Sequence, residues 1–321
     1  ASIEAAPGTV LLDATGAPVE EVSEFFATML ASGASFSSLR SYGLALLRWW
    51  RFLAAIEVPW QRASRNEARD FVLWMRLVGP AGRQTGYAPA TINHALAVIK
   101  MFYADRIAAG DGPLINPVPD ADHRLGRRSQ PHHNPMQPFA PGPRAPYRQK
   151  MPERIPRHLS DRLFDELFAT LRSDRDRALL AFYVSTGARA SELLGVTVDL
   201  VNPGDQRIGV RRKGSGRLQW LPASADAFVW LRLYLAEIGG VGPGDPLWVT
   251  LRRRRDANGK LARIPLSYEA LRAVLRRANA KLGTNWSMHD LRHTCALRMA
   301  ADEHVSLRDV QTILGHAHLE T

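Results

Sequence analysis

Residues 185–194, which read STGARASELL, carry the most informative feature of this sequence. Gly187 should end one helix, and Arg189 should stand near the start of the next. A guanidinium beside the free backbone N–H groups of a helix start is well suited to bind an anion. Taken alone the stretch has a second interpretation, in which Arg189 only pairs with Glu192 at the surface.

A predicted β-hairpin follows. Residues 207–213 (RIGVRRK) and 217–221 (RLQWL) form two short strands around Gly214-Ser215-Gly216. This turn places Lys213 near the tip, where a lysine on a flexible loop can enter a groove and deliver a proton. A solvated turn lysine without a role remains an alternative for this residue.

Residues 289–294 read HDLRHT, and on a helix His289, Arg292 and His293 share one face. The pattern is close to the zinc-binding His-Glu-x-x-His motif, but Arg292 would place a fixed cation beside the metal. We therefore expect no metal and keep a zinc hydrolase only as a weak alternative. Further on, Gly315 of the sequence LGH (314–316) should cap a helix and direct His316 away from its end.

In this order and at these separations, the four features resemble the tyrosine site-specific recombinases, the family of phage integrases and transposon-borne recombinases. The resemblance covers residues 158–321 and implies that Arg189 and Arg292 hold the non-bridging oxygens of a scissile DNA phosphate. It implies that Lys213 protonates the departing 5′ oxygen, that His289 orients the phosphate or accepts a proton, and that His316 donates a further hydrogen bond. The residues expected to support this group are Glu192, Asp290 and His293.

The nucleophile of this family is a tyrosine, which forms a covalent 3′-phosphotyrosyl bond and makes a cofactor unnecessary. It follows shortly after the Leu-Gly-His motif, whereas the seven tyrosines of this sequence all precede that motif. We therefore expect a C-terminally truncated chain with its nucleophile beyond Thr321. Such a chain should bind DNA without cleaving it and should be a monomer when DNA is absent.

The composition agrees with a folded DNA-binding protein. The 321 residues are 45% hydrophobic, and 42 basic against 31 acidic side chains give a net charge of +11. This excludes a wholly disordered chain and favours a polyanionic partner. The single cysteine, Cys295, excludes an intrachain disulfide, and neither a signal peptide nor an apolar membrane span is evident. We expect a cytoplasmic, nucleoid-associated protein without membrane contact.

The fold class we predict is mainly α with a small β component. We divide the chain into an N-terminal segment (1–17), a helical core-binding domain (18–112), a basic linker (113–157) and a mixed α+β catalytic domain (158–321). Four amphipathic helices, at 18–32, 37–56, from 64 onward and at 89–109, should form a bundle whose aromatic residues make the core. The linker holds 11 of the 21 prolines and a net charge of +5, so it should be extended, either along a phosphate backbone or as a plain tether.

The function that the resemblance implies is site-specific DNA recombination, the integration or excision of a mobile element. The partners would be double-stranded DNA and other recombinase subunits in a synaptic tetramer. A DNA-binding or architectural protein without catalysis is the main alternative. The side chains we expect to contact DNA are Arg40, Arg48, Asn93, Lys100, Arg211, Arg212, Arg252, Arg253, Arg254, Arg255, Arg272, Arg276 and Arg277.

Overall fold

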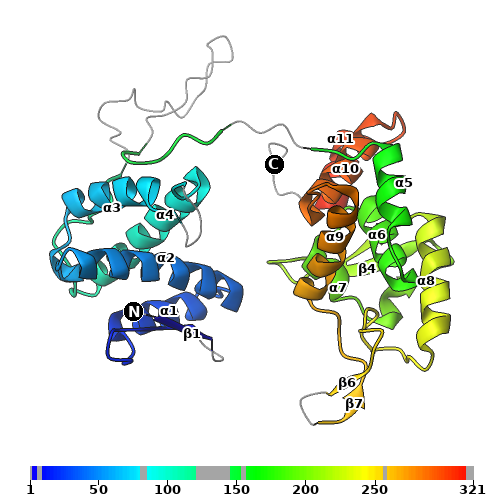
Figure 1. The fold of residues 1–321 in the computed structure, drawn as a ribbon, viewed down its shortest axis with the longest axis horizontal. Helices are drawn as coiled ribbons and strands as arrows, with labels where there is room; N and C mark the ends of the chain where they lie inside the picture. The colour runs from blue at the N-terminus through cyan, green and yellow to red at the C-terminus, as the bar shows by residue number, and fades with distance from the viewer. Residues whose placement is uncertain are drawn as a thin grey trace. The chain divides into compact units, whose positions relative to one another are not determined.

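The computed structural model describes residues 2–5, 9–79, 85–120, 145–152, 157–255 and 259–315. The chain divides into two compact units, Ala1–Glu153 and Arg154–Thr321, and each has its own hydrophobic core (Figure 1). Most of the secondary structure is helical and the sheets are small, so the predicted fold class is confirmed. No helix in the described ranges is both long enough and apolar enough to cross a membrane.

The first unit combines a small hairpin with the four predicted helices. The hairpin lies in the segment 1–17, and the side chain of Leu11 on its second strand is completely buried in the core of the unit. The elements are β1 (Ser2–Ala5), β2 (Thr9–Leu12), α1 (Glu20–Ala31), α2 (Phe36–Ala55), the 3₁₀ turn η1 (Trp60–Arg62), α3 (Arg65–Leu77) and α4 (Pro89–Ala108).

The start of α3 shows how local sequence sets a helix end. The Ser64 hydroxyl accepts a hydrogen bond from the backbone N–H of Asn66 at 3.2 Å, and Glu67 accepts one from the N–H of Ser64 at 2.7 Å. This reciprocal arrangement satisfies backbone donors that have no partner inside the helix. Ser64 and Glu67 therefore form a capping box, the pattern that the sequence Ser-Arg-Asn-Glu (64–67) indicates.

Aromatic side chains fill the core of the first unit, as predicted. Trp49 and Phe71 are fully buried and meet edge to face at 5.1 Å between ring centroids. The Trp49 indole donates to the Tyr103 hydroxyl at 3.1 Å, and this hydroxyl donates to the Trp60 carbonyl at 2.9 Å. Burial raises the pKa of Tyr103, so its hydroxyl stays protonated as a donor.

The described flanks of the predicted linker pack on the first unit. Val118 is buried in its core, and the Asn93 side chain exchanges two hydrogen bonds with the backbone of Gln149, at 3.0 and 2.7 Å. These flanks, residues 113–120 and 145–152, are therefore held by the unit instead of standing free of it. The central part of the linker, 121–144, lies outside the described residues.

The second unit mixes helices with two antiparallel sheets. Its elements are α5 (Asp161–Ala169), α6 (Asp174–Thr186), α7 (Ala190–Leu194), the 3₁₀ turn η2 (Val198–Leu200), β3 (Val201–Asn202), β4 (Arg207–Arg211), β5 (Leu218–Pro222), α8 (Ala225–Ile238), β6 (Arg254–Arg255), β7 (Leu261–Ala262), α9 (Tyr268–Leu282), α10 (Met288–Ala301) and α11 (Leu307–Leu314). The predicted hairpin is confirmed as β4–β5, and β3 extends it to three strands in the order β3-β4-β5.

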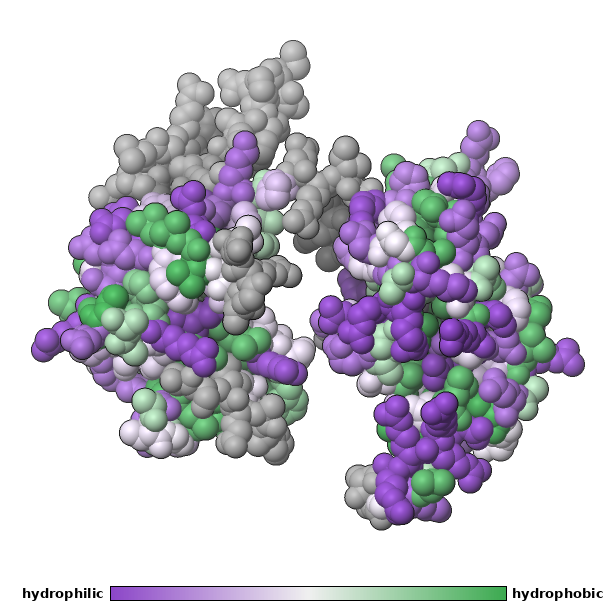
Figure 2. Space-filling view, in the orientation of Figure 1, coloured by the Kyte–Doolittle hydropathy of each residue, from purple (hydrophilic) through white to green (hydrophobic). Residues whose placement is uncertain are grey.

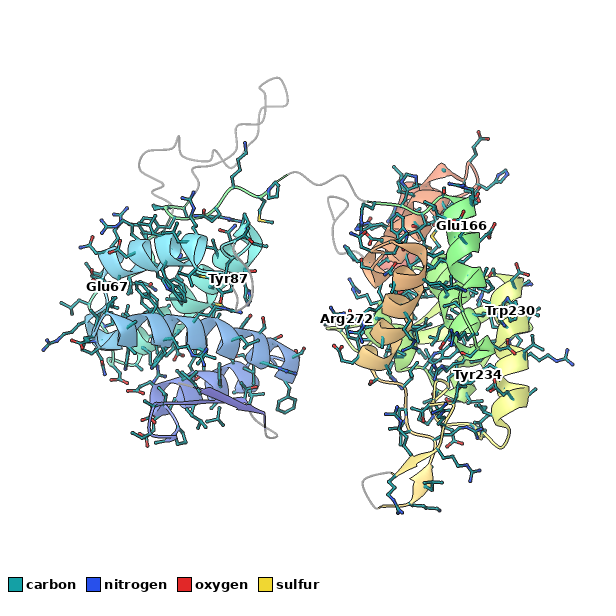
Figure 3. The ribbon with its side chains drawn as sticks, in the orientation of Figure 1. Glu67, Tyr87, Glu166, Trp230, Tyr234 and Arg272 are labelled. Carbon is teal, nitrogen blue, oxygen red and sulfur yellow. The ribbon has the colours of Figure 1, made fainter. Side chains whose placement is uncertain are left out.

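Helix α6 forms the centre of this unit, packed between α8 and α10. Its core partner Trp248 stacks on Tyr234, with ring centroids 5.9 Å apart, and Tyr234 projects from α8 as Trp230 does (Figure 3). The Tyr234 hydroxyl accepts from the Val249 N–H at 3.0 Å and donates to the Leu247 carbonyl at 3.2 Å. This rigid centre fixes the position where α6 ends, which is where the candidate site begins.

Candidate functional site

Helix α6 ends at Gly187, and this glycine admits a close approach of other elements. Its φ of +61° is left-handed, as the predicted helix break requires. A Cβ at this position would lie 2.6 Å from Cδ2 of Leu314 and 3.2 Å from Sγ of Cys295. Only glycine therefore lets α10 and α11 pack against this turn, and Arg189 follows at once as the N-cap residue of α7.

The carboxylate of Glu192 lies at the centre of the site. Its side chain is only 1% exposed and accepts four hydrogen bonds from three residues. Arg189 donates through its backbone N–H and through Nη1, both at 2.9 Å. Arg212 donates through Nη1 at 3.0 Å, and Lys213 through its backbone N–H at 3.1 Å. The predicted support of Arg189 by Glu192 is thus present in the structure, together with two contacts to the hairpin.

The ionisation of Glu192 follows from these contacts. Burial acts to raise the pKa of this carboxyl, but the donors from Arg189 and Lys213 and the charge of Arg212 outweigh it, so the pKa is lowered. Glu192 is therefore an anion that holds the cationic groups of the site in place.

Arg292 joins the same group from α10. Its side chain is buried, and it donates to the Gly187 carbonyl at 2.6 Å and to the Leu314 carbonyl at 2.7 Å. Burial is the main factor that lowers its pKa, and the nearby charges of Arg189 and Arg212 act in the same direction. Arg189, Arg212 and Arg292 lie far apart in the sequence, and the structure places them near enough for their charges to interact.

His289 and His293 lie on one face of α10, as their spacing predicts. Their ring centroids are 4.2 Å apart and their planes meet at 75°. His289 is exposed and His293 half-buried, and burial together with the neighbouring His289 lowers the pKa of His293. Within the described parts of the chain, no group of three or more His, Cys, Asp or Glu side chains could hold a metal ion.

Lys213 lies two residues after the end of the first hairpin strand, β4. Hydrogen bonds from Arg212 N–H to the Arg217 carbonyl and from Gly216 N–H to the Arg212 carbonyl, both 2.9 Å, close the turn beneath it. Its side chain is exposed while its backbone N–H is held by Glu192. The lysine is therefore fixed at its base and free at its tip.

Helix α11 ends beside this cluster. Gly315 adopts a left-handed φ of +66°, which confirms the predicted C-cap. The last carbonyls of the helix are held by the site itself: Gln219 donates to Thr312 at 2.9 Å, Arg212 to Ile313 and Arg292 to Leu314. His316 lies outside the described residues.

Asp290 does not pair with a residue of the cluster. It caps the start of α10 by accepting from Ser287 at 2.8 Å, and it forms an ion pair with Arg157 at 2.7 Å. Arg157 also donates to Asn285 Oδ1 at 2.6 Å and lies 5.0 Å from the centre of the Trp286 ring. The expectation that Asp290 holds a catalytic arginine is corrected accordingly: it anchors the helix that carries Arg292.

Several side chains expected to contact DNA are engaged inside their unit. Asn93 is bound to Gln149, and Lys100 pairs with Asp120. Arg48 donates to the Leu44 carbonyl and lies 5.1 Å from the centre of the Tyr87 ring. Arg212 is buried and each of its three guanidinium nitrogens donates to an acceptor in its own unit, which argues against a DNA contact by this residue. Arg272 forms an exposed ion pair with Glu269 at 3.6 Å. Outside the tetrabasic stretch, the other side chains expected to contact DNA are exposed: Arg40, Arg211, Arg276 and Arg277.

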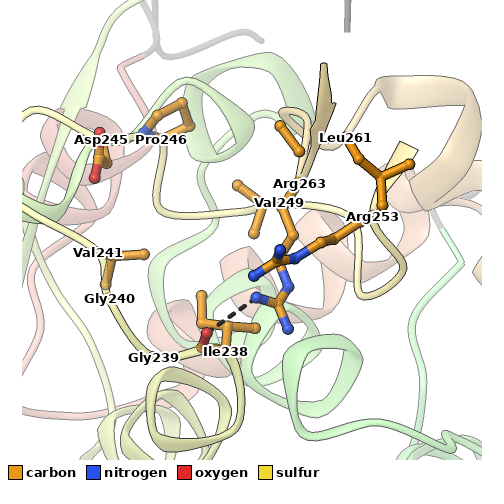
Figure 4. Close-up of a pocket in the computed structure, with 11 residues that line it drawn as sticks. Ile238, Gly239, Gly240, Val241, Asp245, Pro246, Val249, Arg253, Leu261 and Arg263 are labelled. Atoms are coloured by element: carbon orange, nitrogen blue, oxygen red, sulfur yellow. Dashed lines mark hydrogen bonds between the residues drawn. The ribbon is translucent and has the colours of Figure 1, made fainter. Parts of the chain in front are cut away.

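The tetrabasic stretch 252–255 leads into the small β6–β7 hairpin. Hydrophilic residues predominate around this hairpin on the face seen in Figure 2. All four arginines are exposed, and Arg253 lines a cavity of about 600 Å³ together with Arg263, whose Nη1 donates to the Ile238 carbonyl at 3.0 Å (Figure 4). None of Arg189, Glu192, Arg212, Lys213 and Arg292 lines this cavity, so the tetrabasic stretch is separate from the site around Glu192.

The chain is similar to a known protein family and to individual members of it. Residues 157–321 match the model of the phage integrase family. The tyrosine recombinase XerC of Pelobacter propionicus is 31% identical over 276 residues, which cover 84% of this chain and 79% of that protein. The tyrosine recombinase XerD of Pseudomonas aeruginosa is 32% identical over 176 residues, or 52% of this chain and 56% of the relative's length. The chain thus spans little more than half the length of some curated relatives.

Solved structures show the same fold. A lambda integrase (75–356) dimer bound to a COC′ core site has a TM-score of 0.62 at 15% identity, with 94% of this chain and 95% of that chain covered. The Tn1549 transposon integrase (aa 82–397), in complex with circular intermediate DNA, also has a TM-score of 0.62 at 15% identity. The match covers 94% of this chain and 92% of that chain. With the match over 157–321, these comparisons settle the classification: the chain belongs to the phage integrase family, the tyrosine site-specific recombinases.

Proposed function

We propose that this protein carries out site-specific DNA recombination, the integration or excision of a mobile element, through a 3′-phosphotyrosyl intermediate. The observation that carries the proposal is that Arg189 and the Lys213 backbone both bind the buried carboxylate of Glu192, while Arg292 lies near enough for its charge to interact with the same carboxylate. Two guanidinium groups and a lysine held at one place form a site for a phosphodiester whose charge increases during the reaction.

In this mechanism Arg189 and Arg292 bind the two non-bridging oxygens of the scissile phosphate. A tyrosine attacks phosphorus and expels the 5′ oxygen. Lys213 gives a proton to this oxygen, and a lysine that is fixed at its base and free at its tip is suited to the transfer. His289 orients the phosphate or accepts the proton of the nucleophile, with His293 packed behind it, and His316 donates a further hydrogen bond.

The partners in this proposal are double-stranded DNA and further recombinase subunits in a synaptic tetramer. Its support is by analogy, since one structural neighbour is a lambda integrase tetramer bound to a Holliday junction. Residues 18–112 would form the core-binding domain and 158–321 the catalytic domain, and the protein would act in the cytoplasm, associated with the nucleoid. No cofactor enters this mechanism.

The test is covalent trapping on a suicide substrate, a duplex nicked close to the cleavage position so that the 5′ product diffuses away. The full-length protein should accumulate a covalent DNA adduct, and Arg189→Lys and Arg292→Lys should reduce its formation by at least about a hundredfold because a single ammonium cannot form the bidentate contact. Duplex binding by the full-length protein without any adduct would instead indicate the alternative, a DNA-binding protein without catalysis.

A further inference from the structure

We propose that Arg212 is a positioning residue for the strand-cleavage reaction, because it ties the hairpin of Lys213 to Glu192 and to the last turn of α11. This inference rests on the proposed function. The sequence predicts that Arg212 contacts DNA, because it lies beside Lys213 in a basic run. The role inferred here is different, since Arg212 would act within the protein.

The contacts of Arg212 connect three elements of the second unit. Nη1 donates to Glu192 Oε2 at 3.0 Å, Nε donates to Gln219 Oε1 at 2.8 Å, and Nη2 donates to the Ile313 carbonyl. Its side chain is only 7% exposed. Each of its three nitrogens therefore has an acceptor inside the protein.

The contact with α11 is close as well as polar. A Cβ on Gly315 would lie 3.1 Å from both Cζ and Nε of Arg212, so the guanidinium packs directly against this glycine. Cations are favourable at the C-terminal end of a helix, where the last carbonyls lack partners inside the helix. Gln219, itself held by Arg212, donates to the neighbouring Thr312 carbonyl at 2.9 Å. Arg212 therefore fixes the end of α11 to the hairpin.

The link to the chemistry is Lys213, the next residue along the chain. Both residues bind the same carboxylate, Arg212 through its side chain and Lys213 through its backbone N–H at 3.1 Å. The Lys213 side chain is exposed, so its reach is set by the position of its backbone. When Arg212 releases Glu192 and α11, the hairpin loses these anchors, and Lys213 no longer meets the leaving oxygen reliably.

The test compares two leaving groups with the full-length protein on the suicide duplex. With a normal substrate, tyrosine oxygen attacks phosphorus, the P–O5′ bond breaks and the 5′ oxygen takes a proton from Lys213. With a 5′-bridging sulfur, the P–S bond breaks and the sulfur leaves as a thiolate, which needs no proton because thiols are far stronger acids than alcohols.

Arg212→Met and Arg212→Lys should each slow adduct formation on the oxygen substrate by about a hundredfold, in the range for loss of a general acid. On the sulfur substrate both variants should recover to near the wild-type rate, and Lys213→Ala should behave in the same way. Gln219→Ala removes only one partner of Arg212 and should show a smaller loss with the same recovery. The matched control is Arg207→Met, which removes an exposed arginine from the adjoining strand β4 and should match the wild type on both substrates.

The outcomes separate this inference from the function on which it rests. If wild type and Lys213→Ala behave as described but the Arg212 variants are equally slow on both substrates, Arg212 has only a role in folding and the inference is wrong. Wild-type rates for the Arg212 variants on the oxygen substrate would also overturn it. If the wild type forms no adduct on either substrate, the proposed function itself fails and the inference falls with it.

Discussion

At the scale of single residues, Glu192 accepts four hydrogen bonds from three basic residues of the site. Replacing it with Gln keeps the shape but puts an amide donor among groups that are all donors, and it leaves the buried Arg212 without its anion. We expect Glu192→Gln to lower the free energy of unfolding by about 2–4 kcal/mol, as for loss of one partner of a buried charged network. Urea unfolding measures this. Glu166 is exposed (Figure 3) and pairs with Arg162 at 3.7 Å, so Glu166→Gln should change the free energy of unfolding by less than about 0.5 kcal/mol.

The same carboxyl should make stability depend on pH in one direction. Its pKa in the folded protein lies below the usual value of 4.5, so the unfolded state takes up the proton first. The stabilisation is complete above pH 4.5 and is lost as the pH falls through the lower, folded-state pKa. In unfolding experiments across this acidic range, Glu192→Gln should lose less stability than the wild type. The pKa of Asp290 is also lowered, so the Glu192→Gln variant should keep part of the acid-dependent loss of stability. A pH profile identical to that of the wild type would contradict this assignment.

At the scale of elements, the α6–α7 turn depends on the absence of a side chain at Gly187. We expect Gly187→Ala to destabilise the protein by about 2–4 kcal/mol, because a left-handed residue is disfavoured with a Cβ and this Cβ would also overlap Leu314. Thermal or urea unfolding measures the loss.

Gly283 provides the matched control for that substitution. It ends α9 with a similar φ of +65°, but a Cβ there meets nothing within 4 Å. Gly283→Ala should therefore cost only the conformational part, about 1 kcal/mol. Equal losses for the two variants would show that the close approach of α10 and α11 to Gly187 contributes nothing.

At the scale of the whole molecule, the two cores consist of separate sets of residues, one in each unit. We expect Phe71→Ala to cost about 3–5 kcal/mol of stability in the first unit, since it empties a fully buried aromatic site. Hydrogen exchange should show reduced protection in α1–α4 and unchanged protection in α6, α8 and α10. Phe36→Ala, at a side chain 62% exposed, should leave both units unchanged. Loss of protection in α6 of the Phe71 variant would mean that the units unfold together.

The basic β6–β7 hairpin gives a second prediction at this scale. If Arg254 and Arg255 each neutralise one DNA phosphate, replacing both with Gln should reduce the slope of log affinity against log salt by about 2, at roughly 0.9 for each phosphate contact. Fluorescence anisotropy with a labelled duplex over a salt series measures the slope. Arg162→Gln, which removes an exposed arginine of α5, should leave it unchanged. An unaltered slope in the double variant would remove this hairpin from the DNA interface.

Features set by neighbouring residues could be predicted from the sequence, because their causes are local. The capping box of Ser64 and Glu67, the helix breaks at Gly187 and Gly315 and the shared face of His289 and His293 all depend on residues at most four positions apart. The resemblance to the tyrosine recombinases likewise depends on short motifs and on their order in the sequence. The sequence by itself therefore determined the type of fold and the residues from which the site is built.

Only the tertiary structure decided which cation serves which purpose. Arg212 and Arg211 are neighbours with the same side chain, yet Arg212 is buried against Ile313, 101 positions away, and Arg211 is exposed. Asp290 likewise pairs with Arg157, 133 positions away, and not with an arginine of its own motif. An arginine has the same local pattern whether it faces solvent, DNA or a buried carboxylate. Its role is fixed by the acceptors that folding brings within hydrogen-bonding distance, and those lie far away along the chain.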